Sequence, residues 1–281
     1  VPVAPGGNFV NQITTNVGNI ENKGVELTLN TVPVKTRDLT WEFGFNYTYN
    51  NTKITNLLKQ NDPNFKGIDV SGIGGGTGNN IGKFAVGYAP YTFNVYKQVY
   101  NRANGAPIEG LYEDIDRNGQ VNNDDRYYYK KPAPDVLLGI NTQVQYKRVT
   151  IGLSAHGSLG NYLYNNFNSG SGVIRAIQNP LNFIGNASTN FLATNFNNNQ
   201  MLSDYYIENA SFLRLDNINL GYTVGKVFKD KANLRVTATA QNVLVITKYR
   251  GLDPENSSDS GVDGNIYPRP RIFSLGLNFD F

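Results

Sequence analysis

The segment from Asp114 to Asp125 concentrates oxygen-bearing side chains at a spacing that suits a hard cation. Asp114, Asp116 and Asn118 occupy positions 1, 3 and 5 of a twelve-residue calcium-loop pattern, and Gly119 stands at position 6, where the chain must turn sharply. Position 7 contributes a backbone carbonyl, and position 9 contributes an oxygen directly or through water. The predicted ligands are Asp114, Asp116, Asn118, Gln120, Asn122 and Asp125.

The predicted ion is calcium, or magnesium, in a structural role. Asp125 departs from the pattern, which has a longer bidentate Glu at position 12. No helical periodicity flanks the loop, so it is not one half of an EF-hand pair. The alternative is an Asx-rich turn without metal. A bound cation would stiffen a long exposed loop, because without it the three nearby carboxylates repel one another.

A glycine-rich run at 72–78, followed by Gly82-Lys83, invites comparison with a phosphate-binding loop. The comparison fails at two positions of the G-x-x-x-x-G-K-[ST] template. Thr77 stands where the first glycine is required, and Phe84 follows the lysine in place of Ser or Thr. We therefore expect a flexible loop and no nucleotide site.

Other candidates for catalysis are isolated. Glu109 and Glu113 are paired in sequence, but nothing sets two carboxylates across a cleft, and we expect both in a solvated loop. His156 is the only histidine and the chain has no cysteine, so a histidine–cysteine metal site and thiol chemistry are excluded. We predict that the chain is not an enzyme.

The elements that carry this loop are strands with two different faces. In residues 273–281 every odd position is large and apolar, and every even position is small or polar. Residues 41–49 repeat the pattern with five aromatics on one face, which would be an aggregation hazard on an exposed soluble sheet. A change of phase at Asp216-Asn217 predicts a β-bulge. The expected strands are 24–30, 41–49, 136–146, 149–159, 211–224, 234–241 and 273–281.

Composition fits strands that face lipid on one side and water on the other. The 281 residues have a mean hydropathy of -0.40, and no window approaches the roughly 18 to 20 continuous apolar residues of a membrane helix. Membrane β-strands give this result because lipid-facing and lumen-facing residues alternate. The net charge of +3 is too small to indicate nucleic-acid binding.

Connections between the strands alternate in length. Short turns at 34–38, 147–148 and 226–233 alternate with long loops at about 50–133, 160–208 and 248–268. Membrane β-barrels have short periplasmic turns on one side and long extracellular loops on the other. Within the loops, we expect a hairpin at 92–100 and a helical turn near 173–178. We predict an all-β, transmembrane antiparallel barrel, of which about seven strands lie in this chain.

Several segments resemble one family, the SusC/RagA-type TonB-dependent outer-membrane transporters. They recur in family order across nearly the whole chain: Asn19–Leu27, Asp114–Asp125, Ser211–Leu215, Leu220–Tyr222, Gln241-Asn242, Lys248-Tyr249, Asp253–Glu255 and the terminal Phe281. The resemblance implies that residues 1–281 are the C-terminal part of a plugged barrel of about 22 strands. The plug domain and the TonB-contacting region are not in this sequence, and Val1 begins without a leader, so we expect a longer or processed protein.

The resemblance also implies a function and partners. It implies TonB-driven import of an oligosaccharide or peptide across the outer membrane of a Gram-negative bacterium, with a SusD-like lipoprotein as lid. It further implies a dimer of transporter–lipoprotein pairs. Aromatic and Asn/Asp/Gln side chains in the loops suit sugars and peptides equally well, so the substrate class and its contacting residues stay open. The alternatives are a passive outer-membrane porin and a secreted β-rich glycan-binding module or hydrolase.

Overall fold

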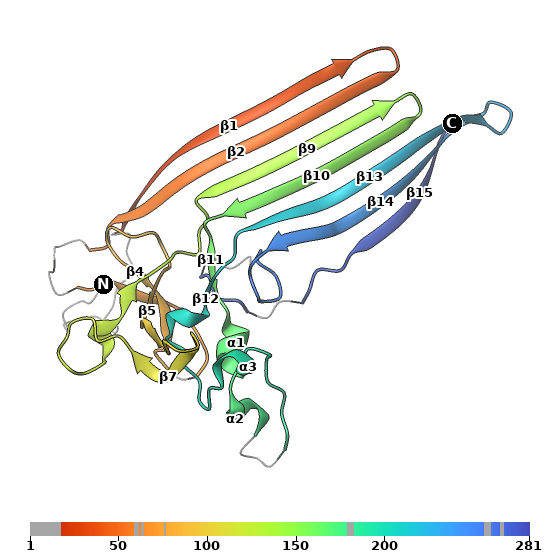
Figure 1. The fold of residues 1–281 in the computed structure, drawn as a ribbon. Coiled ribbons are helices and arrows are strands. Elements are labelled where there is room, and N and C mark those ends of the chain that lie inside the picture. The colour runs from red at the N-terminus through yellow and green to blue at the C-terminus, as the bar shows by residue number, and fades with distance from the viewer. Residues whose placement is uncertain are drawn as a thin grey trace, which may run out of the picture.

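A single seven-stranded antiparallel sheet dominates the molecule (Figure 1). The computed structural model describes residues 18–58, 62, 65–75, 77–178, 183–255, 260–264 and 267–281. The sheet order is β1-β2-β9-β10-β13-β14-β15. These strands are β1 (Asn19–Lys35), β2 (Leu39–Asn56), β9 (Val136–Tyr146), β10 (Val149–Leu159), β13 (Phe212–Val227), β14 (Ala232–Thr247) and β15 (Ile272–Asp280).

All seven predicted strands are present, but most are longer than their alternating cores. Strand β2 continues to Asn56, where Asn and Thr side chains hide the period of two, and β14 continues to Thr247 through an unbroken apolar run at 243–246. The predicted bulge is confirmed, since the pairing of β13 with both of its neighbours shifts around Asp216. The seven strands were therefore predictable, and so were the ends of β9 and β10, whereas β1, β2, β13 and β14 extend beyond their predicted ranges.

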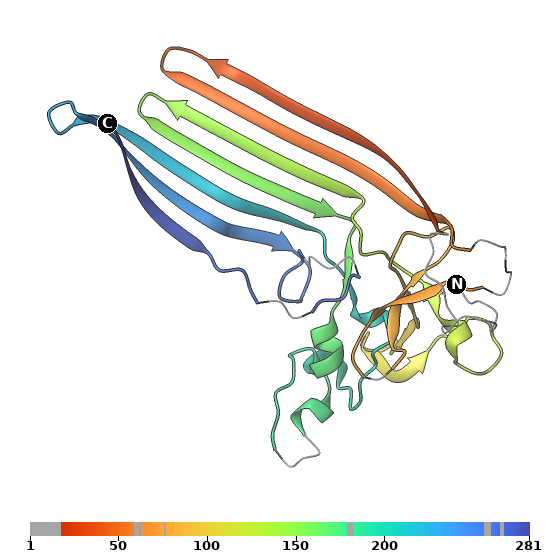
Figure 2. The same cartoon turned by 180° about the vertical axis from the view of Figure 1, so that it is seen from behind.

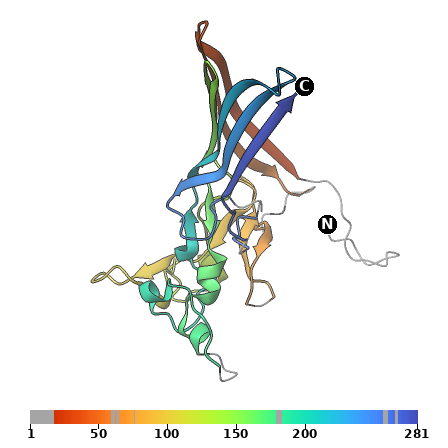
Figure 3. The ribbon, with the colours of Figure 1, turned by 90° about the vertical axis from the view of Figure 1, so that its right-hand side faces the viewer.

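The connections sort to the two ends of the sheet, as Figures 1 and 2 show. Turns 36–38, 147–148 and 228–231 lie at one end, together with the C-terminus. The three long connections gather at the other end. In the side view of Figure 3 the sheet curves like a section of barrel wall above this loop region. The arrangement is that of a barrel fragment, with β1 and β15 at its two edges.

The long connections are folded, and most of the buried core lies in them. The first contains β3 (Ile68–Gly72), β4 (Asn80–Phe84), β5 (Thr92–Val95), β6 (Gln98–Tyr100), β7 (Pro107–Tyr112), the short helix η1 (Asn123–Asp125) and β8 (Tyr127–Tyr128). The second contains β11 (Tyr162–Tyr164), α1 (Asn166–Ser171), α2 (Ile174–Ile177), α3 (Phe191–Thr194), η2 (Asp204–Tyr206) and β12 (Ile207–Asn209). A buried cluster joins both connections through Ile81, Phe93, Val95, Tyr164 and Tyr206.

Two local predictions in the loops have different outcomes. The helical turn near 173–178 is confirmed as α2. The hairpin at 92–100 is wrong, because β5 pairs with β4 and β8 while β6 pairs with β7. The short alternating pattern at 92–100 does correspond to two strands, β5 and β6, but each pairs with strands from other parts of the loop and not with the other. None of the described helices is long and apolar enough to cross a membrane.

The candidate lumen face and metal loop

One face of the sheet carries rows of polar side chains that run across the strands. Asn30 pairs with Gly44, Gly44 with Asn141, Asn141 with Ser154, and Ser154 with Asn217. The next row joins Glu42, Gln143, Gly152 and Asn219 in the same way. Since side chains alternate between faces, residues paired directly across strands share one face. Glu42 and Gln143 therefore lie on one continuous polar surface with the first row.

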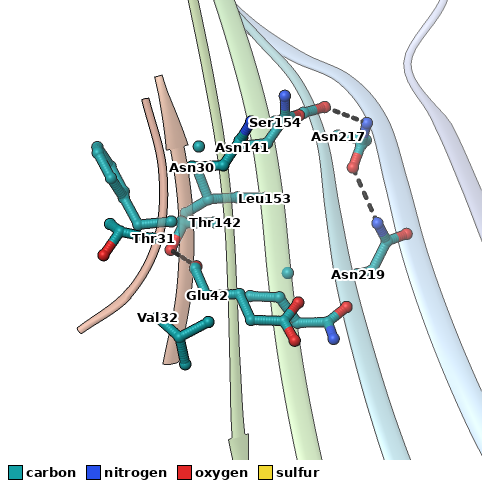
Figure 4. Close-up of a pocket in the computed structure, with 14 residues that line it drawn as sticks. Asn30, Thr31, Val32, Glu42, Asn141, Thr142, Leu153, Ser154, Asn217 and Asn219 are labelled. Atoms are coloured by element: carbon teal, nitrogen blue, oxygen red, sulfur yellow. Dashed lines mark hydrogen bonds between the residues drawn. The ribbon is translucent and has the colours of Figure 1, made fainter. Parts of the chain in front are cut away.

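These rows line a hollow of about 630 Å³, shown in Figure 4. Asn219 donates its side-chain amide to Asn217 Oδ1 at 2.9 Å, and Asn217 donates to Ser154 Oγ. Glycines at 44 and 152 leave room between the carboxamides. The surface offers hydrogen-bond donors and acceptors and little fixed charge.

The opposite face is apolar and exposed in this chain. Phe273, Leu275 and Leu277 on β15 are 77%, 77% and 60% exposed, respectively. The one polar interruption on β9 is satisfied locally. Thr142 accepts a hydrogen bond from the indole N–H of Trp41 at 2.8 Å and donates to the carbonyl of Glu42 at 3.0 Å. A polar group that is bonded this way can face hydrocarbon without an unpaired donor.

The predicted metal loop brings three of its carboxylates together. Asp114, Asp116 and Asp125 each present an oxygen within 4.8 Å of the others. Asp125 is fully buried, whereas Asp116 is exposed. The chain turns where the pattern requires, with Arg117 and Gly119 both at positive φ. Three of the six predicted ligands are therefore assembled at one point.

Backbone N–H groups hold these carboxylates in place. Asp114 accepts from Asn118 and Gly119, and Asp125 accepts from Ile115, Asp116 and Asn122. The N–H of Asn122, followed by the smaller effects of the other two, holds the pKa of the Asp125 carboxyl below its usual value. A carboxylate kept ionised and pointed at two others is a donor set that fits a hard cation.

The other three predicted ligands are engaged within the loop. Asn118 Oδ1 accepts from the N–H of Gln120, and Asn122 Oδ1 caps η1 by accepting from the N–H of Asp124. The side-chain amide of Asn122 lies 3.5 Å from the carbonyl of Gln120. These Asx turns fit both the metal loop and the alternative of a turn without metal, so the ion remains a prediction.

A charged cluster on the lumen side of β13 was not predicted. Arg214 is 3% exposed and contacts Asp253 at 2.6 Å and Asn242 at 2.7 Å. Its Nε lies 3.1 Å from Glu255 Oε2, a charge contact without the alignment of a hydrogen bond. Arg269 contacts the same two carboxylates from the loop side, at 3.4 and 2.6 Å. We call Arg214, Asn242, Asp253, Glu255 and Arg269 the loop clamp.

The loop clamp connects three segments that are far apart in the sequence. It joins β13, β14 and the connection before β15, which contribute Arg214, Asn242 and the Asp253–Glu255 segment, respectively. His156 sits beside it, with Nδ1 2.8 Å from Asp216 Oδ2 and Nε2 3.5 Å from Glu255 Oε1. His156 is directly paired with Arg214 across β10 and β13. His156 therefore lies on the same face as Arg214. The available sequence signal for the cluster was an arginine between two leucines, at Leu213-Arg214-Leu215.

The two predicted loop glutamates have structural partners. Glu109 accepts hydrogen bonds from the backbone of Asn197 and Asn198 at 2.8 and 2.9 Å, and Glu113 pairs with Lys97. Burial opposes the ionised form of Glu109, but the N–H donors outweigh it and lower its pKa. Glu109 ties β7 to the segment after α3. These partners agree with a structural role for both residues.

Comparison with known proteins extends over the whole chain. No protein-family profile matches it. The chain is 40% identical to the TonB-dependent receptor SusC of Bacteroides thetaiotaomicron over 287 aligned residues, which cover 100% of this chain and 28% of SusC. It is 28% identical to TonB-dependent receptor P3 of Formosa agariphila, covering 95% of this chain and 29% of that protein.

Solved structures support the fold. The RagAB peptide transporter matches with a TM-score of 0.71 and 22% identity, over 95% of this chain and 30% of the matched chain. The RagAB importer in its open-open state matches with a TM-score of 0.69. The chain thus spans less than a third of the length of the relatives it matches. From the identity to SusC and the shared barrel fold, the chain belongs to the SusC/RagA-type TonB-dependent transporters and represents a portion of such a protein.

Proposed function

We propose that this chain forms part of the barrel wall of an active importer in a bacterial outer membrane. The observation that carries the proposal is the 40% identity to SusC across the whole chain. The sheet supports it with one polar face, one apolar face and loops gathered at a single end. The cargo would be an oligosaccharide or a peptide too large for simple diffusion, and the similarity to a peptide transporter supports the peptide.

We propose the partners of this chain from the same similarity to SusC and RagAB. A SusD-like lipoprotein would close the extracellular mouth, and the TonB complex would act through a region outside this sequence. A dimer of transporter–lipoprotein pairs is the proposed assembly. The chain itself would contribute wall, loops and lumen surface, and no catalytic step.

Transport assays on the full-length protein separate this function from its alternatives. Cells that depend on the transporter should grow on its cargo only when TonB and the proton gradient are intact. Growth that survives loss of TonB would favour the passive porin. A protein recovered without detergent, with no shift in gel mobility on boiling, would favour the secreted glycan-binding module.

For the loop at Asp114–Asp125 we propose bound calcium, with magnesium as the weaker candidate. The side-chain oxygens of Asp114, Asp116, Asn118 and Asp125 would hold the ion, with the carbonyl of Gln120 and an oxygen of Asn122. The assembled carboxylates and the turn at Gly119 support this proposal. The ion would offset the repulsion among three carboxylates and so stiffen the loop.

Limited proteolysis of the full-length protein tests the ion directly. Chelator, or Asp116→Ala, should raise cleavage within residues 103–130 and leave the barrel intact, because the loop lies outside the sheet. Asp69→Ala is a matched control, since Asp69 is an acidic loop residue paired with Lys83 outside the metal loop. An unchanged cleavage pattern with chelator would favour the Asx turn without metal.

A further inference from the structure

A second cavity, of about 510 Å³, opens where the sheet meets the loop region. Its frame is set by backbone hydrogen bonds at the end of β2. Asn50 donates to the carbonyl of Asp135 at 3.0 Å, whereas Ile54 exchanges hydrogen bonds of 2.8 Å with Gly87 and Tyr88. Between these two points, residues 51–53 of β2 line the opening. The cavity is thus a gap between β2 and the loops, of a size typical of ligand pockets.

The lining carries an excess of positive charge. Three lysines, Lys53, Lys130 and Lys131, line the cavity together with a single acid, Asp135. Lys131 contacts Asp135 at 2.8 Å, and of the other two lysines only Lys130 has no carboxylate within ion-pair distance among the described residues. Lys53 also lies 3.6 Å from Glu21, and its side chain is 48% exposed. A cavity lined in this way attracts an anionic group.

Three tyrosine rings, those of Tyr88, Tyr129 and Tyr162, also line the cavity. Lys130 Nζ lies 5.5 Å from the ring centre of Tyr129 and 5.1 Å from that of Tyr162, so the rings hold the ammonium group near the cavity. Tyr88 stacks on Tyr128 with ring centres 4.0 Å apart, and 42% of its own surface stays exposed. Rigid rings with exposed faces and hydroxyl groups suit the apolar faces and hydroxyls of a sugar ring.

We propose that this cavity binds an anionic sugar unit, meaning a sugar that carries a carboxylate, sulfate or phosphate group. The lysines would hold the anionic group, and the rings of Tyr88, Tyr129 and Tyr162 would pack against the sugar. Two sources share this chemistry. One is a soluble acidic oligosaccharide, and the other is the phosphorylated sugar head group of a glycolipid in the outer leaflet. The second source rests on the outer-membrane location proposed above, whereas the first does not.

Calorimetry on the purified full-length transporter tests the soluble source, with trigalacturonate as the anionic probe and maltotriose as the neutral one. Trigalacturonate should bind saturably, and maltotriose should bind at least about tenfold more weakly, as expected from the loss of one hydrogen bond to a charged group. Lys130→Met should lower the affinity for trigalacturonate by a similar factor. Lys97→Met is the matched control, because Lys97 pairs with Glu113 outside the cavity. Lys53→Met, at a more exposed lysine, is a second variant should Lys130→Met fail to fold.

The lipid source has its own readout. Wild-type protein purified in mild detergent should retain lipid A, detected by mass spectrometry, and Lys130→Met should lose it while Lys97→Met keeps it. The proposal is overturned if trigalacturonate does not bind and lipid A is not retained, or if Lys130→Met and Lys53→Met behave like Lys97→Met. It is also overturned if triglutamate binds as tightly as trigalacturonate, since the site would then recognise charge without a sugar.

Discussion

Replacing Arg214 by Met should release the connection before β15 from the barrel wall. Arg214 is 3% exposed and Asp253 is 5% exposed, so the substitution leaves a buried carboxylate with only part of its partners. Asp253 would keep Arg269 at 3.4 Å and the N–H of Glu255 at 2.9 Å. Removing one partner of a buried ion pair costs about 3 to 5 kcal/mol.

Hydrogen exchange on the full-length protein measures this cost locally. The amides to follow are those of Glu255, bonded to Asp253, and of Asp263, bonded to the carbonyl of Tyr164. A loss of about 3 to 5 kcal/mol lowers protection by a factor between about a hundred and a few thousand. Amides in the middle of β13 should exchange as in the wild type, because the sheet hydrogen bonds are untouched.

Two further variants identify the cause. Arg235→Met removes an exposed arginine from the neighbouring strand β14 and should leave the protection of Glu255 unchanged. Arg214→Met combined with Asp253→Asn removes the uncompensated charge, and should recover part of the lost protection. If Arg214→Met alone left the protection of Glu255 within twofold of the wild type, the loop clamp would not restrain the connection.

Three other predictions follow from the sheet and the loops. Leu277→Arg should destabilise the inserted barrel by about 2 to 4 kcal/mol near the bilayer midplane, and Asn278→Arg on the polar face should cost less; equal costs by denaturant titration in lipid would contradict the assignment of faces. Removing Phe281 should lower the amount of inserted protein more than the stability of barrels that do form, because it deletes a proposed end-strand assembly signal and one apolar contact; normal levels on immunoblots of membranes would argue against that signal. Burial raises the pKa of Tyr112 to about 12 from an ordinary value of 10, so the stabilisation that its burial supplies is complete below pH 10 and is lost as the pH rises from 10 to 12; phenolate absorbance that appears fully by pH 10 in the folded protein would contradict this burial.

The strands were predictable because their period reflects a local rule. In β2 and β15 the polarity of each residue indicates which face of the sheet it lies on. Five aromatics at alternate positions of 41–49 were therefore enough to predict a strand. The same rule fails at the loop end of β2, where Asn51, Thr52 and Asn56 face water whichever way they point. The predicted boundaries therefore stopped short, although the strand pairing continues to Asn56.

The sites also differ in how far they could be predicted, because some are built from residues close in sequence and others from residues far apart. The loop at Asp114–Asp125 holds all its predicted ligands within twelve residues, so spacing alone indicated the three carboxylates that meet. The loop clamp brings together residues as far apart in sequence as Arg214 and Arg269. Their contact depends on the course of a long loop, which residue spacing does not predict. The cavity beside Lys130 depends in addition on where β2 separates from the loops, which became visible only in the structure.

The central claim is that this chain is one wall of a membrane barrel with lipid on one face and water on the other. Spin labels at cysteines introduced singly from Ser274 to Asn278 of the full-length protein, reconstituted in lipid, test it most directly, and this chain has no cysteine of its own. Accessibility to oxygen should peak at Leu275 and Leu277, and accessibility to a water-soluble nickel complex should peak at Ser274, Gly276 and Asn278. An equal response to the nickel complex at all five positions would contradict the claim.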